Sequence, residues 1–542
     1  MDHRLGRRAV RIVLGALAGL LAAGTAIGVG ELVAAFLRPV AAPVIAVGNK
    51  FILLTPEPLK EFAVKRFGAN DKQVLLLGIY AMIAALAIVV GLVALRWLWV
   101  GIVGLLGFGA IGVYAAATAN ASRPSDVVPT IVGTAAAVVV LVVLARALGR
   151  PAGRRVAAAA QDTAAASDPQ PVPDRQPAAP DGQQPGLDRR VFIAGSVAAT
   201  ALAAGSGFGG RALQHARFDA SRSRAAVTLP KPASPAPPLP RGVELNQVPT
   251  SFVTANKDFY RVDTALAIPQ LSADTWRLRI HGKLDRELVL SFDDLLSRPL
   301  IERHITMTCV SNPVGGSYLG TAKFLGVRLA DLLAEAGVHA DADQIVGRSS
   351  DGMTIGTPTA VIMDGRDAML AVGMNDEPLP IQHGFPVRML VPGLYGYVSA
   401  TKWLVDLQAT TFADFDTYWV QRRWAAQAPI RIESRIDTPK PFASLTKGQL
   451  IKIGGVAWHQ HTGIKSVEVQ INDEPWREAV LGRVPSTDTW VQWTLPWTVD
   501  AQGPVSLRVR AIDNNGVMQD QTRREPFPSG ASGWHTVVVQ AG

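Results

Sequence analysis

The sequence predicts a protein of three parts: N-terminal transmembrane α-helices, a mixed α+β domain, and a C-terminal immunoglobulin-like β-sandwich. Of its 542 residues, 48% are hydrophobic and 18% are charged, whereas soluble domains contain about 25% charged residues. Part of the chain is therefore expected in lipid. Apolar runs lie before residue 211, helix and strand patterns mix from residue 242 to 428, and only short strands separated by turns follow.

Five apolar runs predict the transmembrane helices. Each is long enough to cross a hydrocarbon core of about 30 Å at about 1.5 Å per residue. The runs cover residues 12–37, 74–95, 97–119, 127–145 and 191–210. Glu31 interrupts the first run near its end, where it is either an interfacial residue or a proton or ion site.

The fifth run allows two interpretations. Arg189 and Arg190 precede it, and the segment 189–193 resembles a twin-arginine export signal, although an internal one. The alternative is an ordinary transmembrane helix with a positively charged cytoplasmic flank. Both interpretations place the far side of the segment outside the cytoplasm.

Arginines before the first run and after the fourth place both ends of this four-helix block in the cytoplasm. They are Arg4, Arg7, Arg8, Arg11, Arg146, Arg150, Arg154 and Arg155. The loop 38–72 should then lie outside, although it also carries basic residues. The fifth run exports everything after it, so we expect a multi-pass protein of the cell membrane with an extracytoplasmic globular part.

Local sequence patterns predict the helices and strands of the globular part. The alternating segment 275–281 predicts a strand, Ser291 predicts a helix N-terminus, and the segment 329–336 predicts a helix ending at Gly337. Later strands are predicted at 451–453, 466–471, 490–494 and 506–512. We divide the chain into a four-helix transmembrane region (1–148), a disordered cytoplasmic linker (149–188), a fifth transmembrane helix or signal anchor (189–211), a Pro-rich linker (212–241), the mixed domain (242–428) and the sandwich (429–542).

Charge and cysteine content exclude several classes of function. The net charge is +9, from 53 Lys and Arg against 44 Asp and Glu, but no long basic run is present, so no nucleic-acid partner is expected. The single cysteine, Cys309, excludes an intrachain disulfide and any cysteine-rich zinc or iron–sulfur site.

Cys309 lies at the end of a predicted strand, residues 304–309, and opens into the polar turn 311–316. A thiol in this position is placed to meet a ligand. The alternative is a buried small apolar side chain, and the local sequence alone favours it.

Four separated blocks give a larger pattern. They are residues 250–266 (TSFVTANKDFYRVDTAL), 306–316, 374–403, and a tail with matches at 467–476, 490–497 and 509–516. In this order they resemble the sulfite oxidase family of molybdopterin enzymes, over roughly residues 242–540. The segment 383–388 (HGFPVR) is the most specific part, and the first four apolar runs lie outside the resemblance.

The resemblance implies a sulfite-oxidase-like fold for residues 242–428 and a dimerisation domain after it. In the family, one molybdenum is held by the dithiolene of a pterin and by one cysteinate, which Cys309 matches as the catalytic metal ligand. Cofactor contacts would come from Asn256, Phe259, Tyr260, Asp351, His383, Arg388, Ser399, Thr401 and Lys402. Asp351 equally fits a plain turn, and the choice between Ser399 and Thr401 stays open because this block is one residue longer than in sulfite-oxidising members.

Two departures restrict the expected chemistry. Sulfite-oxidising members carry arginines just after the ligand cysteine, whereas Cys309 is followed by Val310, Ser311, Asn312, Pro313 and Val314, so sulfite is a doubtful substrate. None of the nine histidines lies in a predicted span, so we expect no haem in this chain. The pair His459 and His461 is either a metal pair or a solvated turn.

The resemblance implies a membrane-anchored, outward-facing oxidoreductase with one molybdenum-molybdopterin per chain. It would transfer an oxygen atom and two electrons to or from a small molecule such as a sulfoxide, an N-oxide or a sulfur compound, in either direction. Its expected partners are the lipid bilayer, a separate quinone-linked or cytochrome electron carrier, and a second copy bound through the C-terminal domain. The alternative is a cofactor-free, degenerate domain that serves as a membrane-anchored binding module.

Overall fold

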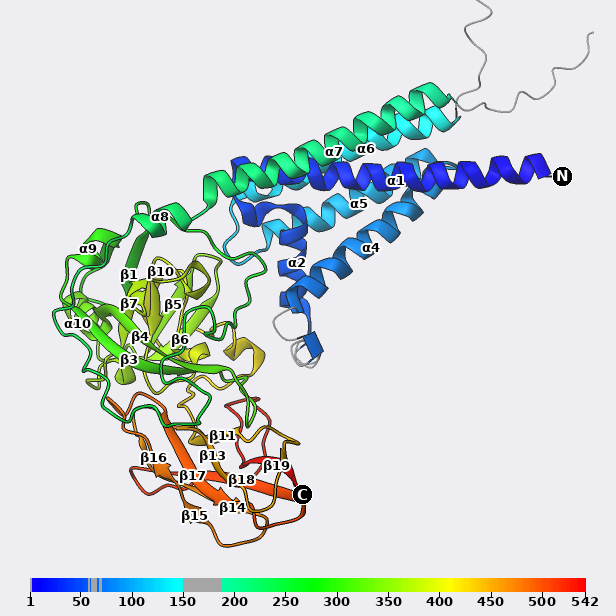
Figure 1. Ribbon diagram of the computed structural model, residues 1–542. Helices are drawn as coiled ribbons and strands as arrows, with labels where there is room; N and C mark the ends of the chain where they lie inside the picture. The colour runs from blue at the N-terminus through cyan, green and yellow to red at the C-terminus, as the bar shows by residue number, and fades with distance from the viewer. Residues whose placement is uncertain (1, 57–58, 60–65, 68–70, 150–187) are drawn as a thin grey trace, which may run out of the picture. The chain divides into compact units, whose positions relative to one another are not determined.

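The computed structural model describes residues 2–56, 59, 66–67, 71–149 and 188–542 (Figure 1). The predicted linker 149–188 therefore lies almost entirely outside the described residues. The chain forms two compact units. The first comprises Met1–Asp219 with Ala265–Ala267, and the second comprises Ala220–Thr264 with Ile268–Gly542.

The first unit is helical. Its helices are α1 (Asp2–Phe36), α2 (Pro43–Leu54), α4 (Asp71–Ala94), α5 (Leu98–Ala117), α6 (Val128–Gly149) and α7 (Arg189–Phe218), with short 3-10 turns η1 (Pro39–Ala41) and η3 (Pro124–Val127). Within the described ranges, five helices are long and apolar enough to cross a membrane, and they match the five predicted runs. The short helix α2 was not predicted, because its apolar stretch is too short to resemble a span.

Helix α1 packs against α4, α6 and α7. Small residues permit this close packing. A Cβ atom on Gly19 of α1 would lie only 1.9 Å from the Ala87 carbonyl oxygen of α4. Glu31 is buried against α7, where the Gln214 side-chain amide donates to its carboxylate at 3.0 Å.

Helix α7 is longer than the predicted run 191–210. It continues to Phe218, and the apolar candidate span that contains it extends over Arg189–Ala226. His215 therefore lies within this span, which corrects the prediction that every histidine falls outside the spans. The correction arises because polar residues after Gly210 continue the helix without a break signal.

The first part of the second unit contains one mixed sheet and one antiparallel sheet. One has the order β2-β1-β10-β5-β6, and the other has the order β3-β4-β7-β8 with β9 also paired to β7. The strands are β1 (Arg277–Gly282), β2 (Leu288–Ser291), β3 (Leu300–Thr308), β4 (Leu319–Arg328), β5 (Gln344–Ser349), β6 (Thr354–Pro358), β7 (Met369–Met374), β8 (Glu377–Pro378), β9 (Arg388–Leu390) and β10 (Leu404–Thr410). The helices are α8 (Ser221–Ala226), α9 (Phe292–Leu296), α10 (Leu329–Ala336) and α11 (Thr359–Ile362), with 3-10 turns η4 (Ile381–His383), η5 (Gly396–Val398) and η6 (Val420–Arg422).

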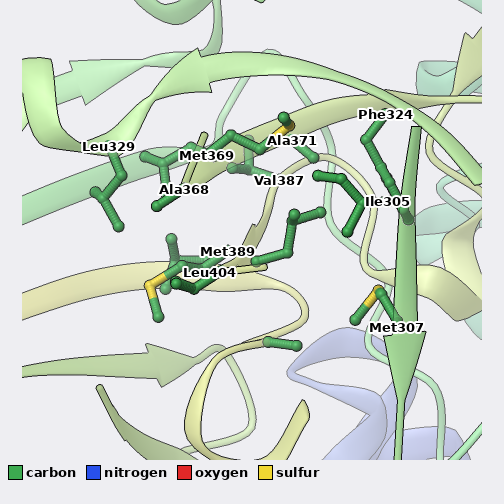
Figure 2. Packing of buried hydrophobic residues seen from close by; sticks show 14 of the residues in the cluster. Ile305, Met307, Phe324, Leu329, Ala368, Met369, Ala371, Val387, Met389 and Leu404 are labelled. Carbon is green, nitrogen blue, oxygen red and sulfur yellow. The ribbon is translucent and has the colours of Figure 1, made fainter. Parts of the chain in front are cut away.

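The core of this part draws apolar side chains from both sheets. Figure 2 shows Ile305 and Met307 of β3 near Phe324 of β4, with Met389 of β9 and Leu404 of β10 in the same cluster. All five residues are nearly or fully buried. Burial of this apolar surface is the main stabilising contribution to the domain, at about 25 cal/mol per Å².

The local predictions for this part are confirmed. Ser291 caps α9 in a reciprocal box with Asp294, and α10 ends at Gly337, which adopts a left-handed conformation with φ of 69°. The segment predicted as a Pro-rich linker, 212–241, contains the end of α7 and all of α8. It also contains Ser234, which forms a parallel bridge with Ile301 at the start of β3.

The C-terminal part consists of two sheets that share a core. Their orders are β11-β13-β17-β16 and β12-β19-β18-β14-β15. The strands are β11 (Glu433–Thr438), β12 (Ser444–Leu445), β13 (Leu450–Trp458), β14 (Ile464–Ile471), β15 (Arg477–Glu478), β16 (Val480–Leu481), β17 (Val491–Thr498), β18 (Gly503–Asp513) and β19 (His535–Ala541). Ile453 and Trp493 of the first sheet pack in one cluster with Val467 and Leu507 of the second. The four predicted strands are confirmed, while the immunoglobulin-like assignment stays a prediction.

Candidate functional site

Cys309 immediately follows β3, as predicted. Its N–H donates to the Tyr318 carbonyl at 2.9 Å, and its carbonyl accepts from the Asn312 N–H at 3.1 Å. The Asn312 side-chain oxygen in turn accepts from the Tyr318 N–H at 2.8 Å. These bonds close the loop after the strand and fix the direction of the Cys309 side chain, which is buried.

The surroundings of the Cys309 thiol act on its pKa in opposite directions. Burial raises the pKa, because the thiolate loses its hydration. Hydrogen bonds from the Ser311 backbone and hydroxyl, together with the positive charge of Lys402, lower it in part. The thiol therefore stays protonated by itself, whereas a coordinating metal ion would remove the proton.

Residues of the C-terminal part also form hydrogen bonds to the cysteine loop and to the strand end before it. The Arg435 guanidinium of β11 donates to the Gly316 carbonyl at 2.7 Å. The Gln460 amide donates to the Thr308 hydroxyl at 2.9 Å, directly before the cysteine. Gly315 adopts a φ of 79° against His535, and a Cβ atom there would lie 2.3 Å from the imidazole. The loop conformation thus depends on residues far along the chain.

Two aromatic side chains lie between the cysteine loop and the HGFPVR segment. Phe259 and Tyr260 stack with ring centroids 5.3 Å apart, and Phe259 meets the His383 ring edge-on at 5.6 Å. Tyr260 is close enough to Cys309 for the two ionisations to oppose each other. Burial and, secondarily, the Cys309 charge raise the pKa of Tyr260, so its hydroxyl keeps its proton.

His383 is buried and neutral. Its Nε2 lies 3.1 Å from the Asn256 carbonyl oxygen, so Nε2 carries the proton and donates. Burial and the neighbouring Arg388 charge lower the pKa of His383 to about 4. The ring can therefore offer its other nitrogen as an acceptor.

Arg388 is a buried cation that pairs with no carboxylate among the described residues. Its Nη1 donates to the His383 carbonyl at 3.2 Å, while its Nε has no hydrogen-bond partner among the described residues. Burial lowers the pKa of Arg388 to about 10, yet the guanidinium remains charged at neutral pH. A buried charge without a counter-charge is costly unless a ligand supplies the anion.

The segment after η5 carries three polar side chains that differ in their hydrogen-bond partners. The Ser399 hydroxyl bonds the carbonyls of Leu394 and Tyr395 at 3.1 and 3.0 Å. The Thr401 hydroxyl is fully buried and finds no partner in the part of the chain that the structure describes. Lys402 donates to the Asp263 carboxylate at 2.9 Å, although burial still lowers the pKa of Lys402 to about 8.

These groups fit a bound phosphate. Arg388 Nε and the Thr401 hydroxyl are buried donors that lack acceptors in the described part of the chain, which is rare in native proteins without a ligand. A planar guanidinium and a hydroxyl are suitable donors for phosphate oxygens. The residues present are therefore compatible with an anionic cofactor tail.

Two of the predicted residues are occupied by local contacts. The Asn256 side-chain amide donates to Glu377 at 2.5 Å and accepts from Asn375 at 2.9 Å. Only the backbone carbonyl of Asn256 therefore contacts His383. Asp351 lies in the turn between β5 and β6, and its carboxylate accepts from the Met353 N–H at 3.1 Å. This geometry is that of a plain turn.

Sequence reasoning missed four residues near this cluster. Arg261 and Asp263 form an ion pair at 2.8 Å, and Asp263 also holds Lys402. Tyr395 and Glu433 are also buried, and burial raises the pKa of Tyr395, with a further contribution from the charge of Glu433. Arg261 and Asp263 belong to the matched block 250–266, but a charged pair two residues apart carries no signal of its own. Tyr395 and Glu433 lie far apart in the sequence, so no local pattern relates them.

The first two basic residues that follow the cysteine loop in the sequence are not available for a substrate anion. Lys323 is paired with Glu302 at 3.3 Å and with Asp376 at 2.6 Å. Arg328 is paired with Asp367 at 2.5 Å. Their charges are already balanced by carboxylates.

The histidine pair in the turn after β13 is also occupied. His459 lies 3.0 Å from Asp513 and His461 lies 3.3 Å from Asp488. No cluster of three or more metal-ligating side chains occurs among the residues whose positions are described. The solvated-turn interpretation therefore accounts for both histidines.

Comparisons with known proteins agree with this geometry. The family model "Oxidoreductase molybdopterin binding domain" matches residues 265–419. Mitochondrial sulfite oxidase of Rattus norvegicus is 29% identical over 342 residues, which are 54% of this chain and 62% of the rat protein. The uncharacterised oxidoreductase YuiH of Bacillus subtilis is 35% identical over 135 residues, which are 25% of this chain and 65% of that protein.

The chain is also similar to a solved structure, that of the sulfane dehydrogenase SoxCD from Paracoccus pantotrophus. It is 24% identical, covers 54% of this chain and 82% of its own, and has a TM-score of 0.48. The chain thus matches less than two thirds of the length of the sulfite oxidase and YuiH relatives. The family match and the sequence relatives lead to one conclusion: residues 265–419 form a molybdopterin-binding oxidoreductase domain that is similar in sequence to the sulfite oxidases.

Proposed function

We propose that this protein is a membrane-anchored enzyme that transfers an oxygen atom and two electrons to or from a small neutral molecule, such as a sulfoxide, an N-oxide or a reduced sulfur compound. The catalytic part would face outward from the cell membrane. One molybdenum-molybdopterin would be bound per chain. The observation that carries the proposal is the buried, uncompensated guanidinium of Arg388 in the same cluster as Cys309 and Tyr260.

Each side chain of the cluster would have the role that its charge and its hydrogen-bond partners allow. Cys309 would supply the thiolate ligand, and Ser311 would hold the sulfur in position through its hydrogen bonds. Arg388 Nε and the Thr401 hydroxyl, which have no acceptor among the described residues, would bind the phosphate, whereas Ser399 would support the loop from inside. Neutral His383 with Phe259 and Tyr260 would line the pterin, with Asn256, Asp351 and Lys402 at its margin.

The bound metal would supply the two-electron redox chemistry, which no side chain can perform. The protein's own part is positioning and charge control. Arg388 would neutralise the cofactor tail, Asp263 holds Lys402 and Arg261 on one carboxylate, and the Tyr260 hydroxyl keeps its proton as a hydrogen-bond donor. Burial of these groups excludes water from the site.

The charge around Cys309 supports a neutral substrate. A sulfite dianion needs fixed cationic donors to compensate for its lost hydration. Residues 310–314 carry no charge, and the nearest downstream cations, Lys323 and Arg328, are paired with carboxylates. A neutral oxide needs only one hydrogen-bond donor and an apolar wall.

The five apolar helices support the membrane anchor, and the arginine pattern supports the outward orientation. Electrons would pass to or from a separate carrier, either quinone-linked or a cytochrome. The C-terminal sheets are proposed as an immunoglobulin-like domain that pairs two copies.

The test compares sulfite oxidation with sulfoxide and N-oxide reduction on cofactor-loaded protein in detergent. A redox dye replaces the physiological carrier, so that its absence does not hide activity. We expect neutral oxides to react and sulfite to react poorly. Rapid sulfite oxidation at low concentration, with no reaction of the oxides, would overturn the substrate assignment.

A further inference from the structure

Arg435 of β11 is a buried cation for which the proposed function has no role. Its side chain is 10% exposed and pairs with Asp437, which is 7% exposed, through Nε at 2.6 Å and Nη2 at 3.3 Å. Nη1 donates to the Gly316 carbonyl at 2.7 Å, and Nη2 donates to the Thr250 hydroxyl at 3.5 Å. The Thr250 hydroxyl in turn donates to Asp437 at 2.6 Å. Every guanidinium nitrogen is therefore bonded within the protein, so Arg435 is placed to hold structure and not to bind a substrate anion.

Hydrogen bonds connect Gly316 back to Cys309 through the cysteine loop, residues 310–316. The Gly316 N–H donates to the Pro313 carbonyl at 2.7 Å, and the Asn312 N–H donates to the Cys309 carbonyl at 3.1 Å. Tyr318 closes the loop, because its N–H donates to the Asn312 side chain and its carbonyl accepts from the Cys309 N–H. A Cβ atom on Gly316 would lie 2.5 Å from the Asn312 side-chain oxygen. A displacement of Gly316 would therefore be transmitted to Cys309.

Strand β11 also supports the loop one residue earlier, through His535. The Ile436 N–H donates to His535 Nδ1 at 2.9 Å, which fixes the ring beside the strand. The opposite edge of the ring faces Gly315, where a Cβ atom would overlap Cδ2 and Nε2. Gly315 has a φ of 79°, in the left-handed region that favours glycine. Strand β11 thus supports two successive loop residues, one through Arg435 and one through His535.

The strand end before the cysteine is held by other residues of the C-terminal part. The Gln460 amide donates to the Thr308 hydroxyl at 2.9 Å and to the Thr306 carbonyl at 3.2 Å. The Thr306 hydroxyl accepts from the Trp490 N–H at 2.8 Å. The end of β3 is therefore fixed independently of Arg435, and the cysteine loop is the segment whose position depends on Arg435.

We propose that Arg435 is a positioning residue for oxygen-atom transfer, which acts by holding the cysteine loop and thereby the sulfur of Cys309. This inference rests on the proposed function and adds to it a residue outside the matched domain 265–419. A misplacement of about 1 Å at a reacting group can lower a rate about 100-fold. A buried ion pair contributes little stability compared with apolar side chains of similar size, so stability alone does not account for this pair.

A thiol-labelling experiment tests the position of the loop without metal or turnover. Cys309 is the single cysteine of the chain, so a maleimide reports on this loop alone. The full cofactor-free chain is labelled in detergent without denaturant. Because the thiol is buried, wild type should react slowly, and Arg435→Met should react about 10- to 100-fold faster, as expected for a lost hydrogen bond from a charged donor.

Arg510→Met is the matched control for labelling. Arg510 donates to Glu468 at 2.7 Å within the same C-terminal part, and its bonds do not involve the cysteine loop. Arg510→Met should therefore label at the wild-type rate. An Arg435→Met protein that labels as slowly as wild type would overturn the proposal.

A double variant separates position from stability. Arg435→Met alone leaves the Asp437 carboxylate buried and unpaired, which also lowers stability. Arg435→Met/Asp437→Val replaces both charges by apolar side chains, so the unfolding midpoint should return toward the wild-type value. The Gly316 carbonyl still lacks its donor, so labelling should remain fast. If labelling returns to the wild-type rate together with the midpoint, the pair is structural and the proposal is wrong.

A kinetic experiment tests the consequence for the reaction. With a dye as electron carrier, the cofactor-loaded double variant should retain its molybdenum content but lose about 10- to 100-fold in kcat. Arg435→Lys should keep part of the rate, because an ammonium group can pair with Asp437 and donate to Gly316, although without the planar fork of arginine. A wild-type kcat in the double variant would refute the positioning role.

The two proposals fail in different ways. Wild-type protein that carries molybdenum but transfers no oxygen atom contradicts the proposed function. The labelling rates then still decide whether Arg435 holds the cysteine loop, because they require neither metal nor substrate.

Discussion

Lys402 and Asp263 form a nearly buried ion pair, with Nζ 2.9 Å from the carboxylate oxygen and side-chain exposures of 12% and 4%. Arg261 shares the same carboxylate at 2.8 Å. Asp263 thus offsets the charge of Lys402, the cation that acts on the Cys309 thiol, and Arg388 is left to balance a ligand. The relation explains how two basic side chains can lie together in a closed site.

Removal of Asp263 should therefore destabilise the protein in a pH-dependent way. In Asp263→Asn, Lys402 becomes an uncompensated buried cation, and breaking such a pair costs about 3–5 kcal/mol. The pKa of Lys402, already lowered to about 8, should fall further, so the loss should shrink as pH rises and the amine becomes neutral. Unfolding midpoints from pH 6 to 9 measure this, with Asp263→Asn/Lys402→Met as the control that should recover stability. A loss that is independent of pH would contradict the explanation.

Arg388 should show the opposite behaviour. Because it has no counter-charge, Arg388→Met should leave the unfolding midpoint of the cofactor-free protein unchanged or raise it. Cofactor binding should weaken by roughly 10- to 100-fold, the value of a lost hydrogen bond to a charged group. Pterin and molybdenum content per chain measures the binding. Thr401→Val should weaken binding to a smaller degree, whereas Ser399→Ala should act on stability. Equal loss of binding and stability in Arg388→Met would assign it a structural role.

The buried His383 and the half-buried His535 should make the second unit sensitive to acid. Burial lowers the pKa of both His383 and His535 to about 4, so the folded state binds fewer protons than the unfolded state between pH 6.5 and 4. Stability is therefore fully present above pH 6.5 and is lost as pH falls through this window, by on the order of 3 kcal/mol per histidine. Unfolding midpoints of the full chain measured against pH should flatten in part when His535 is replaced by Gln. An unchanged pH dependence would contradict the assignment.

Much of the fold could be predicted because its signals are local. The five spans, the Ser291 cap, the Gly337 stop and the β3 strand each follow from a few consecutive residues. The extent of α7 beyond Gly210 was missed, since a polar helix end differs little from a linker in sequence.

The candidate site was predictable only where consecutive residues carry it. The family motif led to Arg388 and Thr401, and the structure then distinguished the free Thr401 hydroxyl from the bonded Ser399 hydroxyl. The partnership of Lys402 with Asp263 spans 139 positions, and Arg435 reaches Gly316 over 119. Such pairings depend on tertiary contacts and leave no local pattern.

The orientation in the membrane can be tested with reporter fusions. The arginine distribution predicts that everything after Arg211 is extracytoplasmic. A fusion after Pro240 should therefore be active with a periplasmic reporter and silent with a cytoplasmic one, and a fusion after Leu148 should show the reverse. Activity of the Pro240 fusion only as a cytoplasmic reporter would reverse the topology.

The central claim is that Cys309 binds the molybdenum of a working enzyme. The most direct measurement compares wild type with Cys309→Ser for pterin content, molybdenum content and dye-linked turnover of any accepted substrate. Serine replaces a soft sulfur by a hard oxygen, so we expect turnover to collapse while the pterin stays bound by Arg388 and its neighbours. Full turnover by Cys309→Ser would contradict the account.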